Sequence, residues 1–385
     1  MKVTRRKWVG QAACAVATAG ISSMFARRAN AFPKPHHADP NVITGEGSLK
    51  ARAAARGLLA GAAVNTQLLR SDETYRRVLG EQYSMLVAEN CMKFGPTQPK
   101  PGEYYFNEAD GLVAFAEANG MKMRGHNFVW HEALPQWFAG TVTKENAKKI
   151  LVDHIMTVGG RYKGRIHSWD VVNEAVWIPD GRPDGLRSSS PWFQMLGPEY
   201  IDLAYRTARE VDPKALLTYN DYGIEYDNAE EGKKRAAVLD LLKRMKAAGT
   251  PVDALGVQSH LNAASTSSFG KAPNELLEGA RQLGLQVFIT ELDVKDDGLE
   301  TDEIEERDKK VAAVYREFTG RMLEGKEVKA VLTWGVSDAH TWLNGPKWRV
   351  KHPDRKQRPL PFDDQFKPKP TFFALRESFD NAKRR

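Results

Sequence analysis

Residues 166–174 read Ile-His-Ser-Trp-Asp-Val-Val-Asn-Glu, a short run rich in apolar and β-branched side chains that ends in an amide and a carboxylate. Near-continuous hydrophobicity over this length is typical of a parallel β-strand that is covered on both faces. Seven further runs of the same kind recur along the chain, at 58–65, 85–90, 121–127, 215–220, 254–259, 286–292 and 328–336. The sequence therefore predicts eight buried strands.

Helical patterns separate these runs. Apolar side chains recur at helical spacing through 147–158 and 201–211, and a third segment, 230–248, is rich in helix formers and stops at Gly249. Strands that alternate with helices form a parallel sheet, and eight such strands close into a (β/α)8 TIM barrel. An open doubly wound sheet would need a glycine-rich loop after its first strand, which this sequence lacks. We therefore expect an α/β fold with a single barrel domain at 49–385.

The first residues have the character of an export signal. Arg5-Arg6 is a twin-arginine pair, an alanine-rich apolar stretch follows, and Ala29-Asn30-Ala31 supplies an A-x-A cleavage site. The sequence predicts a twin-arginine-type signal at 1–31 and a loose leader at 32–48. We expect the mature protein in the periplasm or the external medium.

Charge and cysteine content exclude several classes of function. Residues 1–31 contain six basic and no acidic side chains, so the rest of the chain is nearly neutral and gives no sign of nucleic-acid binding. Cys14 lies in the signal, which leaves Cys91 without a partner for an intramolecular disulfide. The mature part has no apolar run long enough to span a bilayer. We expect a monomer without a cofactor. We expect no metal site either, because the adjacent His36 and His37 lack a third ligand.

In such a barrel the functional side chains come from the carboxyl ends of the strands, where the connecting loops form a cleft. Each of these residues alone would more simply be structural, but they gather at one mouth of the barrel. Carboxylates and amides beside aromatic faces suit sugars, whose rings present an apolar face and a hydroxyl rim. The candidates are Glu89, Asn90, Lys93, His126, Trp130, Asn173, Glu174, Tyr222, Gln258, His260, Glu291, Asp293, Trp334 and Trp342.

Two of these carboxylates stand roughly opposite each other across the predicted mouth. Glu174 closes the fourth strand and Glu291 the seventh, and glycosidic bonds are cut between two such carboxyl groups. No histidine or cysteine cluster suggests a metal, and no G-x-S-x-G motif suggests a serine esterase. The residues alone therefore indicate an acid/base and nucleophile pair for glycoside hydrolysis.

The strand-end motifs resemble those of glycoside hydrolase family 10, the endo-β-1,4-xylanases. WDVVNE at 169–174 and ITELD at 289–293 resemble the two active-site signatures of the family. The resemblance runs from about residue 50 to 380 and implies a retaining endo-β-1,4-xylanase that hydrolyses internal bonds of xylan or xylo-oligosaccharides by double displacement. The other matching motifs are ENCMK at 89–93, RGHNFVWH at 124–131, YNDY at 219–222, GVQSH at 256–260 and WGVSD at 334–338.

The resemblance also implies a role for each matched residue. Glu174 would be the acid/base and Glu291 the nucleophile, while Asn173 would bind the 2-hydroxyl of the cleaved sugar. His260, oriented by Asp293, would keep Glu291 ionised. The remaining residues would bind the substrate: Glu89, Asn90, Lys93, His126 and Gln258 through its hydroxyls, Trp130, Trp334 and Trp342 as aromatic walls, and Tyr222 as a further contact.

One position departs from the family pattern. Ala133 stands where the family usually has a glutamine that crowds the hydroxymethyl group of a hexose, whereas Trp342, the other crowding residue, is present. A β-1,4-glucanase or a mixed xylanase and glucanase on the same barrel is therefore the alternative. A non-catalytic sugar-binding protein is a third hypothesis, but it would have no use for two carboxylates that repel each other.

Overall fold

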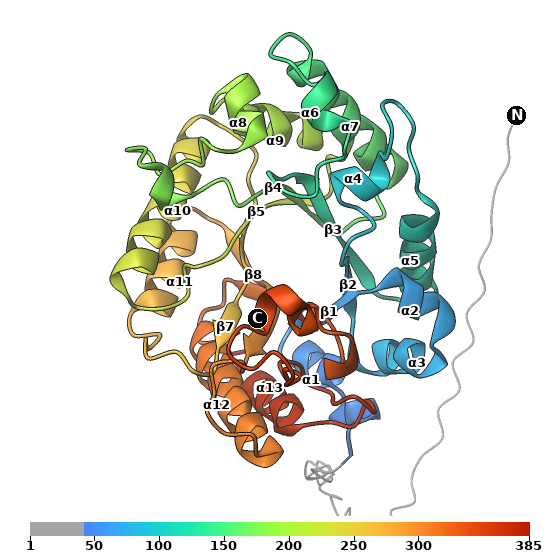
Figure 1. Ribbon diagram of the computed structural model, residues 1–385, viewed down its shortest axis with the longest axis vertical. Helices are drawn as coiled ribbons and strands as arrows, with labels where there is room; N and C mark the ends of the chain where they lie inside the picture. Colours follow the sequence, from blue (N-terminus) through green and yellow to red (C-terminus); the bar gives the residue numbers. More distant parts are fainter. Residues whose placement is uncertain (1–41) are drawn as a thin grey trace, which may run out of the picture. The chain divides into compact units, whose positions relative to one another are not determined.

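Eight parallel strands close into a barrel, with the helices outside it (Figure 1). The computed structural model describes residues 42–385. Strands pair in chain order from β1 to β6, β8 then pairs with both β6 and β9, and β9 pairs with β1 to close the ring. This confirms the predicted α/β barrel. The strands are β1 (Leu59–Val64), β2 (Met85–Ala88), β3 (Lys122–Val129), β4 (Ser168–Asn173), β5 (Leu216–Asp221), β6 (Ala254–Val257), β7 (His260–Asn262), β8 (Gln286–Lys295) and β9 (Val328–Thr333).

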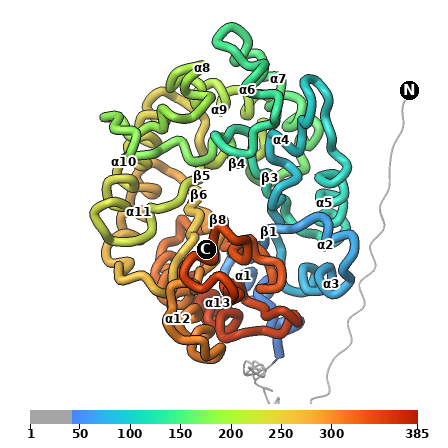
Figure 2. Tube along the Cα trace, in the orientation of Figure 1, coloured from blue at the N-terminus to red at the C-terminus, as the bar shows by residue number. Residues whose placement is uncertain are grey.

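The helices form a ring around the strands, which the chain trace in Figure 2 makes easy to follow. Longer helices connect successive strands, and short ones lie in the loops at the strand ends. They are α1 (Leu49–Ala54), α2 (Thr66–Ser71), α3 (Glu73–Gln82), α4 (Phe94–Thr97), α5 (Asn107–Ala118), α6 (Phe138–Thr141), α7 (Ala147–Arg161), α8 (Pro191–Leu196), α9 (Tyr200–Val211), α10 (Ala229–Ala247), α11 (Ala272–Gln282), α12 (Ile304–Met322) and α13 (Pro370–Asn381). Short 3-10 helices are η1 (Gly45–Gly47), η2 (Ile178–Asp180), η3 (Asp338–His340), η4 (Trp342–Asn344) and η5 (Pro346–Trp348).

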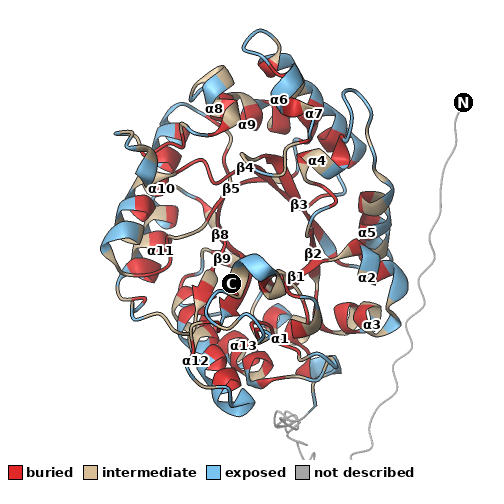
Figure 3. Ribbon diagram, in the orientation of Figure 1, coloured by how far each residue is buried: buried red, intermediate tan, exposed pale blue. Residues whose placement is uncertain are grey.

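Burial explains why the strands were visible as apolar runs. Every residue of β4 is buried, and the strands form the buried ring in Figure 3. Large and small side chains alternate inside the barrel, where Phe288 and Leu332 pack with Ala254 and Ala330. The space is tight enough that a Cβ on Gly125 would lie 2.1 Å from the ring of Trp169. Close packing of this kind fixes the positions from which the strand ends project.

The sixth predicted strand, at 254–259, is interrupted in the structure. β6 ends at Val257, and Ser259 has a φ of +65°. The chain then resumes as β7, which pairs with the far end of β8. A left-handed residue breaks the regular strand geometry, and the hydrophobic pattern carries no signal of it.

Helix α10 shows the predicted start and stop signals. The Asn228 side chain accepts a hydrogen bond from the Glu231 amide at 2.9 Å and caps the first turn. The helix ends at Ala247, and Gly249 follows with a φ of +69°, a conformation that glycine adopts without a steric penalty. These bounds confirm the helix expected at 230–248.

The predicted signal at 1–31 and most of the leader at 32–48 lie outside the described residues, so both stay predictions. The described part of the leader contacts helix α3, because the Gln82 side chain donates to the Ile43 carbonyl (2.9 Å). Within residues 42–385, no helix has the length and apolar character needed to cross a bilayer. The same part of the chain contains no group of His, Cys, Asp or Glu side chains arranged to hold a metal ion.

Candidate active site

The two candidate carboxyl groups are joined through two amides at one mouth of the barrel. Glu174 directly follows β4, and Glu291 lies within β8. The Asn220 amide, from the end of β5, donates to Glu291 Oε1 (2.7 Å) and to Asn173 Oδ1 (2.8 Å). The Asn173 amide donates in turn to Glu174 Oε1 (3.1 Å). This chain of hydrogen bonds fixes the two carboxyls relative to each other.

The surroundings of Glu174 favour its protonated form. Burial raises the pKa of Glu174 to about 7, and the charges of Asp221 and Glu291 act in the same direction. A hydrogen bond from Gln258 Nε2 (2.9 Å) opposes the shift without cancelling it. Glu174 can therefore hold a proton near neutral pH.

An imidazole beside Glu174 supplies no counter-charge. His131 Nδ1 lies 3.9 Å from Glu174 Oε2. Burial and the charges of Arg187 and Lys234 lower the pKa of His131 to about 3. The ring is therefore neutral at pH 7 and does not stabilise an ionised Glu174.

Glu291, by contrast, is held as a carboxylate. Burial alone would raise its pKa, but the hydrogen bond from His260 Nε2 (3.2 Å), the charges of His126 and His260, and the Asn220 amide lower the pKa to about 2. Burial also disfavours a charged His260, yet Asp293 and Glu291 raise the pKa of His260 well above its usual value. Protonated His260 donates to both carboxylates, with Nδ1 2.9 Å from Asp293 Oδ1.

Trp342 anchors the far end of this chain of contacts. Its Nε1 donates to Asp293 Oδ2 at 2.7 Å, and its ring lies 5.0 Å from that of His260. The sequence indicated Trp342 only as an aromatic wall. The structure adds a hydrogen bond that orients Asp293 and, through it, His260.

A second group of predicted residues surrounds Lys93. Its Nζ donates to Asn90 Oδ1 (3.0 Å) and faces the rings of Trp130 and Trp334, at 5.2 and 5.9 Å from their centroids. Burial lowers the pKa of Lys93 and raises that of Glu89. Polar groups beside two aromatic faces match the mixed surface of a sugar ring.

His126 joins this group through Trp334. The two rings are 5.3 Å apart, and His126 Nδ1 lies 2.9 Å from Asp170 Oδ2. Asp170 also pairs with the buried Arg124, which lies two residues before His126 in β3. Asp170 therefore orients the His126 ring, a role that the sequence did not indicate.

Tyr222 belongs to a third group, which also contacts the Glu174 backbone. Arg187 donates from Nε to the Glu174 carbonyl (2.9 Å) and from Nη2 to the Tyr222 hydroxyl (3.4 Å). Lys234 Nζ lies 3.6 Å from the centroid of the Tyr222 ring, and the Trp177 ring is 6.5 Å away. All fourteen predicted residues thus lie in these connected groups, and Arg187, Lys234 and Trp177 extend them.

Comparison with known proteins agrees with this arrangement. Residues 48–378 match the profile of glycosyl hydrolase family 10. The chain belongs to this family. The match covers the whole barrel, including every strand that contributes to the site.

Several similar proteins carry xylanase names. Endo-1,4-beta-xylanase B of Thermotoga neapolitana is 37% identical over 309 residues, which cover 79% of this chain and 83% of that protein. Endo-1,4-beta-xylanase C of Paenibacillus barcinonensis is 36% identical over 347 residues, which cover 82% of this chain but only 30% of that protein. Xylanase 10B from Thermotoga petrophila, solved in complex with xylobiose, has a TM-score of 0.76 at 34% identity and covers 86% of this chain and 97% of its own.

Within this family barrel, Glu174 has an uncommon backbone conformation. Its φ is +59°, which is costly for a residue with a side chain. The Glu174 amide donates to the Asn220 carbonyl (2.9 Å), and its carbonyl accepts from Arg187. Two neighbours therefore hold the backbone so that the carboxyl meets the amides of Asn173 and Gln258.

Asn220 is the main site residue that sequence reasoning missed. Its position at a strand end, within the YNDY motif, was the available signal. Its side chain also accepts a hydrogen bond from Thr290 Oγ1 (2.7 Å), which fixes the orientation of the amide. Only the folded barrel shows that this amide connects Asn173 to Glu291.

Ala133 lies in the loop after β3 and is half-buried. Its φ is +51°, and its carbonyl accepts a hydrogen bond from the Gly95 amide (2.8 Å). Gly95 is two residues beyond Lys93, so this loop packs against the segment that carries the Lys93 group. The backbone of Ala133 therefore lies beside the segment that carries the Lys93 group.

Proposed function

We propose that this chain is a retaining endo-β-1,4-xylanase that hydrolyses internal bonds of xylan or xylo-oligosaccharides. One observation carries the proposal: the carboxyl groups of Glu174 and Glu291 are linked through Asn173 and Asn220 but have different surroundings. Burial favours the protonated form of Glu174, whereas the hydrogen bond with His260 favours the ionised form of Glu291. A retaining glycosidase needs these two states before its substrate arrives. The family, and the xylanases among its similar members, support xylose as the sugar.

In the first half-reaction, Glu291 attacks the anomeric carbon while Glu174 gives its proton to the glycosidic oxygen. The bond between the anomeric carbon and the glycosidic oxygen breaks, and the released chain leaves with the proton. The sugar stays bound to Glu291 as an ester. In the second half-reaction, ionised Glu174 takes a proton from water as the water oxygen attacks the same carbon and frees Glu291. Two inversions retain the anomeric configuration.

We assign roles to the surrounding residues from their contacts with the two carboxyls and with each other. We assign Asn173, which lies between the carboxyls, to the 2-hydroxyl of the cleaved sugar, where a hydrogen bond can strengthen in the transition state. His260 and Asp293 keep Glu291 ionised. Substrate hydroxyls would bind Glu89, Asn90, Lys93, His126 and Gln258, with Trp130, Trp334 and Trp342 as aromatic walls and Tyr222 as a further contact.

The purified protein should therefore hydrolyse xylan and release its product first as the β anomer. Retention follows from the ester on Glu291, which a single direct displacement by water would not form. NMR during the first minutes, before mutarotation, measures the configuration, and cellulose serves as the comparison polymer. A product that appears first as the α anomer, or no hydrolysis of any β-1,4-glycan, would overturn the proposal.

A second candidate function, a mixed xylanase and glucanase, is favoured by Ala133. Xylose and glucose differ by one hydroxymethyl group, and a cleft of this kind rejects that group by steric exclusion. Ala133 offers only a methyl group beside the Lys93 segment, whereas Trp342 still covers His260. We propose that xylosides are preferred and that glucosides are hydrolysed measurably.

Ala133→Gln should widen the preference for xylosides, by roughly the 1–3 kcal/mol that one such group can discriminate. The effect should fall on kcat/KM for aryl cellobiosides and leave aryl xylobiosides nearly unchanged. Ala139→Gln, on an exposed position of α6, is the matched control. The idea fails if the wild type has no glucoside activity or if Ala133→Gln leaves the ratio unaltered.

A further inference from the structure

The turn that joins β6 to β7, residues 258–260, contacts both candidate carboxyls through its first and last residues. Gln258 Nε2 donates to Glu174 Oε1 (2.9 Å), and His260 Nε2 lies 3.2 Å from Glu291 Oε2. The Gln258 carbonyl also accepts the backbone N–H of Glu291 (3.0 Å). The conformation of this turn, residues 258–260, therefore sets the surroundings of both carboxyls at once.

The middle residue of the turn, Ser259, is strained and fully buried. Its φ of +65° persists only where neighbouring groups hold it. The Ser259 N–H donates to Glu225 Oε1 at 2.8 Å. A buried N–H that loses its acceptor is costly, so without Glu225 the turn would have to change its conformation.

Glu225 is itself buried and fixed by its neighbours. Its second oxygen, Oε2, accepts the Ile224 N–H (2.7 Å), and its own N–H donates to Glu231 Oε2 (2.8 Å). Arg235 Nη1 donates to the carbonyls on both sides of Glu225, those of Ile224 (3.1 Å) and Tyr226 (3.0 Å). The carboxylate that meets Ser259 therefore has little freedom to move.

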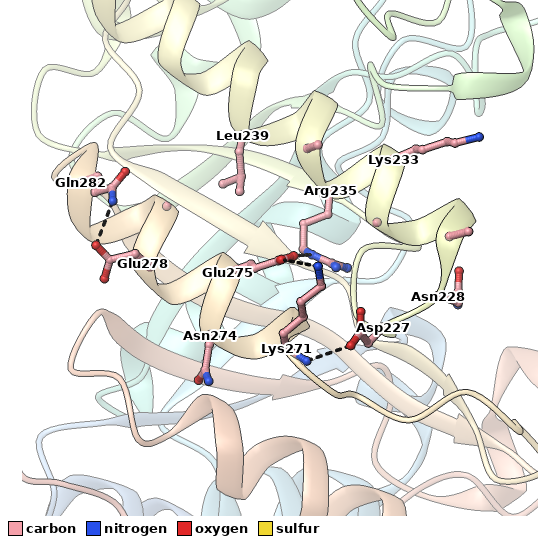
Figure 4. A pocket seen from close by; sticks show the side chains of 14 residues that line it. Asp227, Asn228, Lys233, Arg235, Leu239, Lys271, Asn274, Glu275, Glu278 and Gln282 are labelled. Atoms are coloured by element: carbon pink, nitrogen blue, oxygen red, sulfur yellow. Dashed lines mark hydrogen bonds and ion pairs between the residues drawn. The ribbon is translucent and has the colours of Figure 1, made fainter.

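Arg235 is anchored in the groove between α10 and α11 (Figure 4). Its Nε donates to Glu275 Oε2 at 2.8 Å, and Lys271 pairs with the same carboxylate. The residues that line this groove include no aromatic ring, so we assign no sugar to it. The Arg235–Glu275 pair supports the segment that carries Glu225.

We propose that Glu225 is a positioning residue that holds the turn at 258–260 and, through it, both Glu174 and Glu291. The proposal rests on the hydrolase function proposed above. Glu225 reaches the turn through Ser259, because one of its carboxylate oxygens accepts the Ser259 N–H while the other accepts the Ile224 N–H. Its effect should therefore appear in the titration of the two carboxyls and not in substrate binding alone.

Glu225→Gln tests the proposal because an amide has one acceptor oxygen and cannot accept both N–H groups. We expect kcat/KM for an aryl β-xylobioside to fall by about 10- to 100-fold, the effect of a small misplacement of reacting groups. Both limbs of the pH profile should move to higher pH. A weaker Gln258 hydrogen bond raises the pKa of Glu174, and a looser His260 contact raises that of Glu291.

Asp212→Asn is the matched control. Asp212 is also buried and also accepts two backbone N–H groups, from Gly164 (2.9 Å) and Lys214 (3.2 Å). It lies before β5 begins, whereas Glu225 follows the end of β5. We expect Asp212→Asn to lower Tm as Glu225→Gln does, while keeping the wild-type kcat/KM and pH limbs.

The outcomes separate this proposal from the function on which it rests. If Glu225→Gln keeps the pH profile and the kcat/KM of the wild type, and the wild-type protein cleaves xylan, the positioning role is overturned and the proposed function stands. An inactive wild-type protein would overturn the function itself. If Glu225→Gln does not fold, Glu225→Asp keeps the charge but withdraws the carboxylate by one methylene, and it should shift both limbs in the same direction; unshifted limbs would overturn the proposal.

Discussion

Replacing Glu291 by alanine should abolish turnover of every glycoside, with a loss in kcat of at least about 10⁴-fold. Without the carboxylate no ester can form, and neither half-reaction can proceed. The loss should not depend on the leaving group, because even an activated aryl group needs a nucleophile. The measurement is kcat for aryl β-xylobiosides of differing leaving-group pKa, and mass spectrometry should find no sugar attached to the variant.

Azide distinguishes a missing nucleophile from a damaged fold. In Glu291→Ala the small anion can enter the vacated space and attack the anomeric carbon directly, which gives a glycosyl azide of α configuration. Glu278→Ala, on the exposed face of α11, is the control and should behave as the wild type. Assignment of Glu291 as nucleophile fails if the variant keeps more than about 0.01% of the wild-type kcat without azide.

Much of the fold was predictable because the burial of a strand restricts which residue types the strand can contain. Strands covered on both faces must be apolar along their length, so β4 and β8 stand out as runs in the sequence. Alternation with helices then fixes the barrel and puts the strand ends at one mouth. Glu174 and Glu291 were found on that basis, because polar and aromatic side chains from several strand ends gather with them at that mouth.

The remaining features depend on contacts between segments far apart in the chain. Asn220 connects Asn173 to Glu291, partners 47 and 71 residues away. The kink at Ser259, which separates β7 from β6, is held by Glu225, 34 residues earlier. Hydrogen bonds of this kind are set by side-chain geometry after the barrel closes, and neither periodicity nor motif spacing records them.

Replacing Glu174 by glutamine should lower kcat/KM strongly for substrates with poor leaving groups and little for substrates with good ones. Glutamine keeps the size of the side chain but has no proton to give, so kcat/KM for xylan should fall by about 10²- to 10⁴-fold. A dinitrophenyl leaving group departs without protonation, and its kcat/KM, which reports the first half-reaction, should stay near the wild-type value. The ester on Glu291 should then accumulate as a burst, because no base activates water. Equal losses on both substrates would exclude Glu174 as the acid.

The pH profile gives the same assignment from an independent direction. Burial raises the pKa of Glu174 to about 7, so the fraction that carries the proton falls above that pH, and wild-type kcat/KM should decline by about tenfold per pH unit. The acid limb should lie far lower, because the His260 hydrogen bond and its neighbours overcome burial and bring the pKa of Glu291 to about 2. In Glu174→Gln the alkaline limb should disappear on the dinitrophenyl substrate, while the acid limb stays in place because Glu291 must still be ionised. A variant that retained the wild-type decline above pH 7 would require a different group as the acid, and His131, neutral through this range, could not be that group.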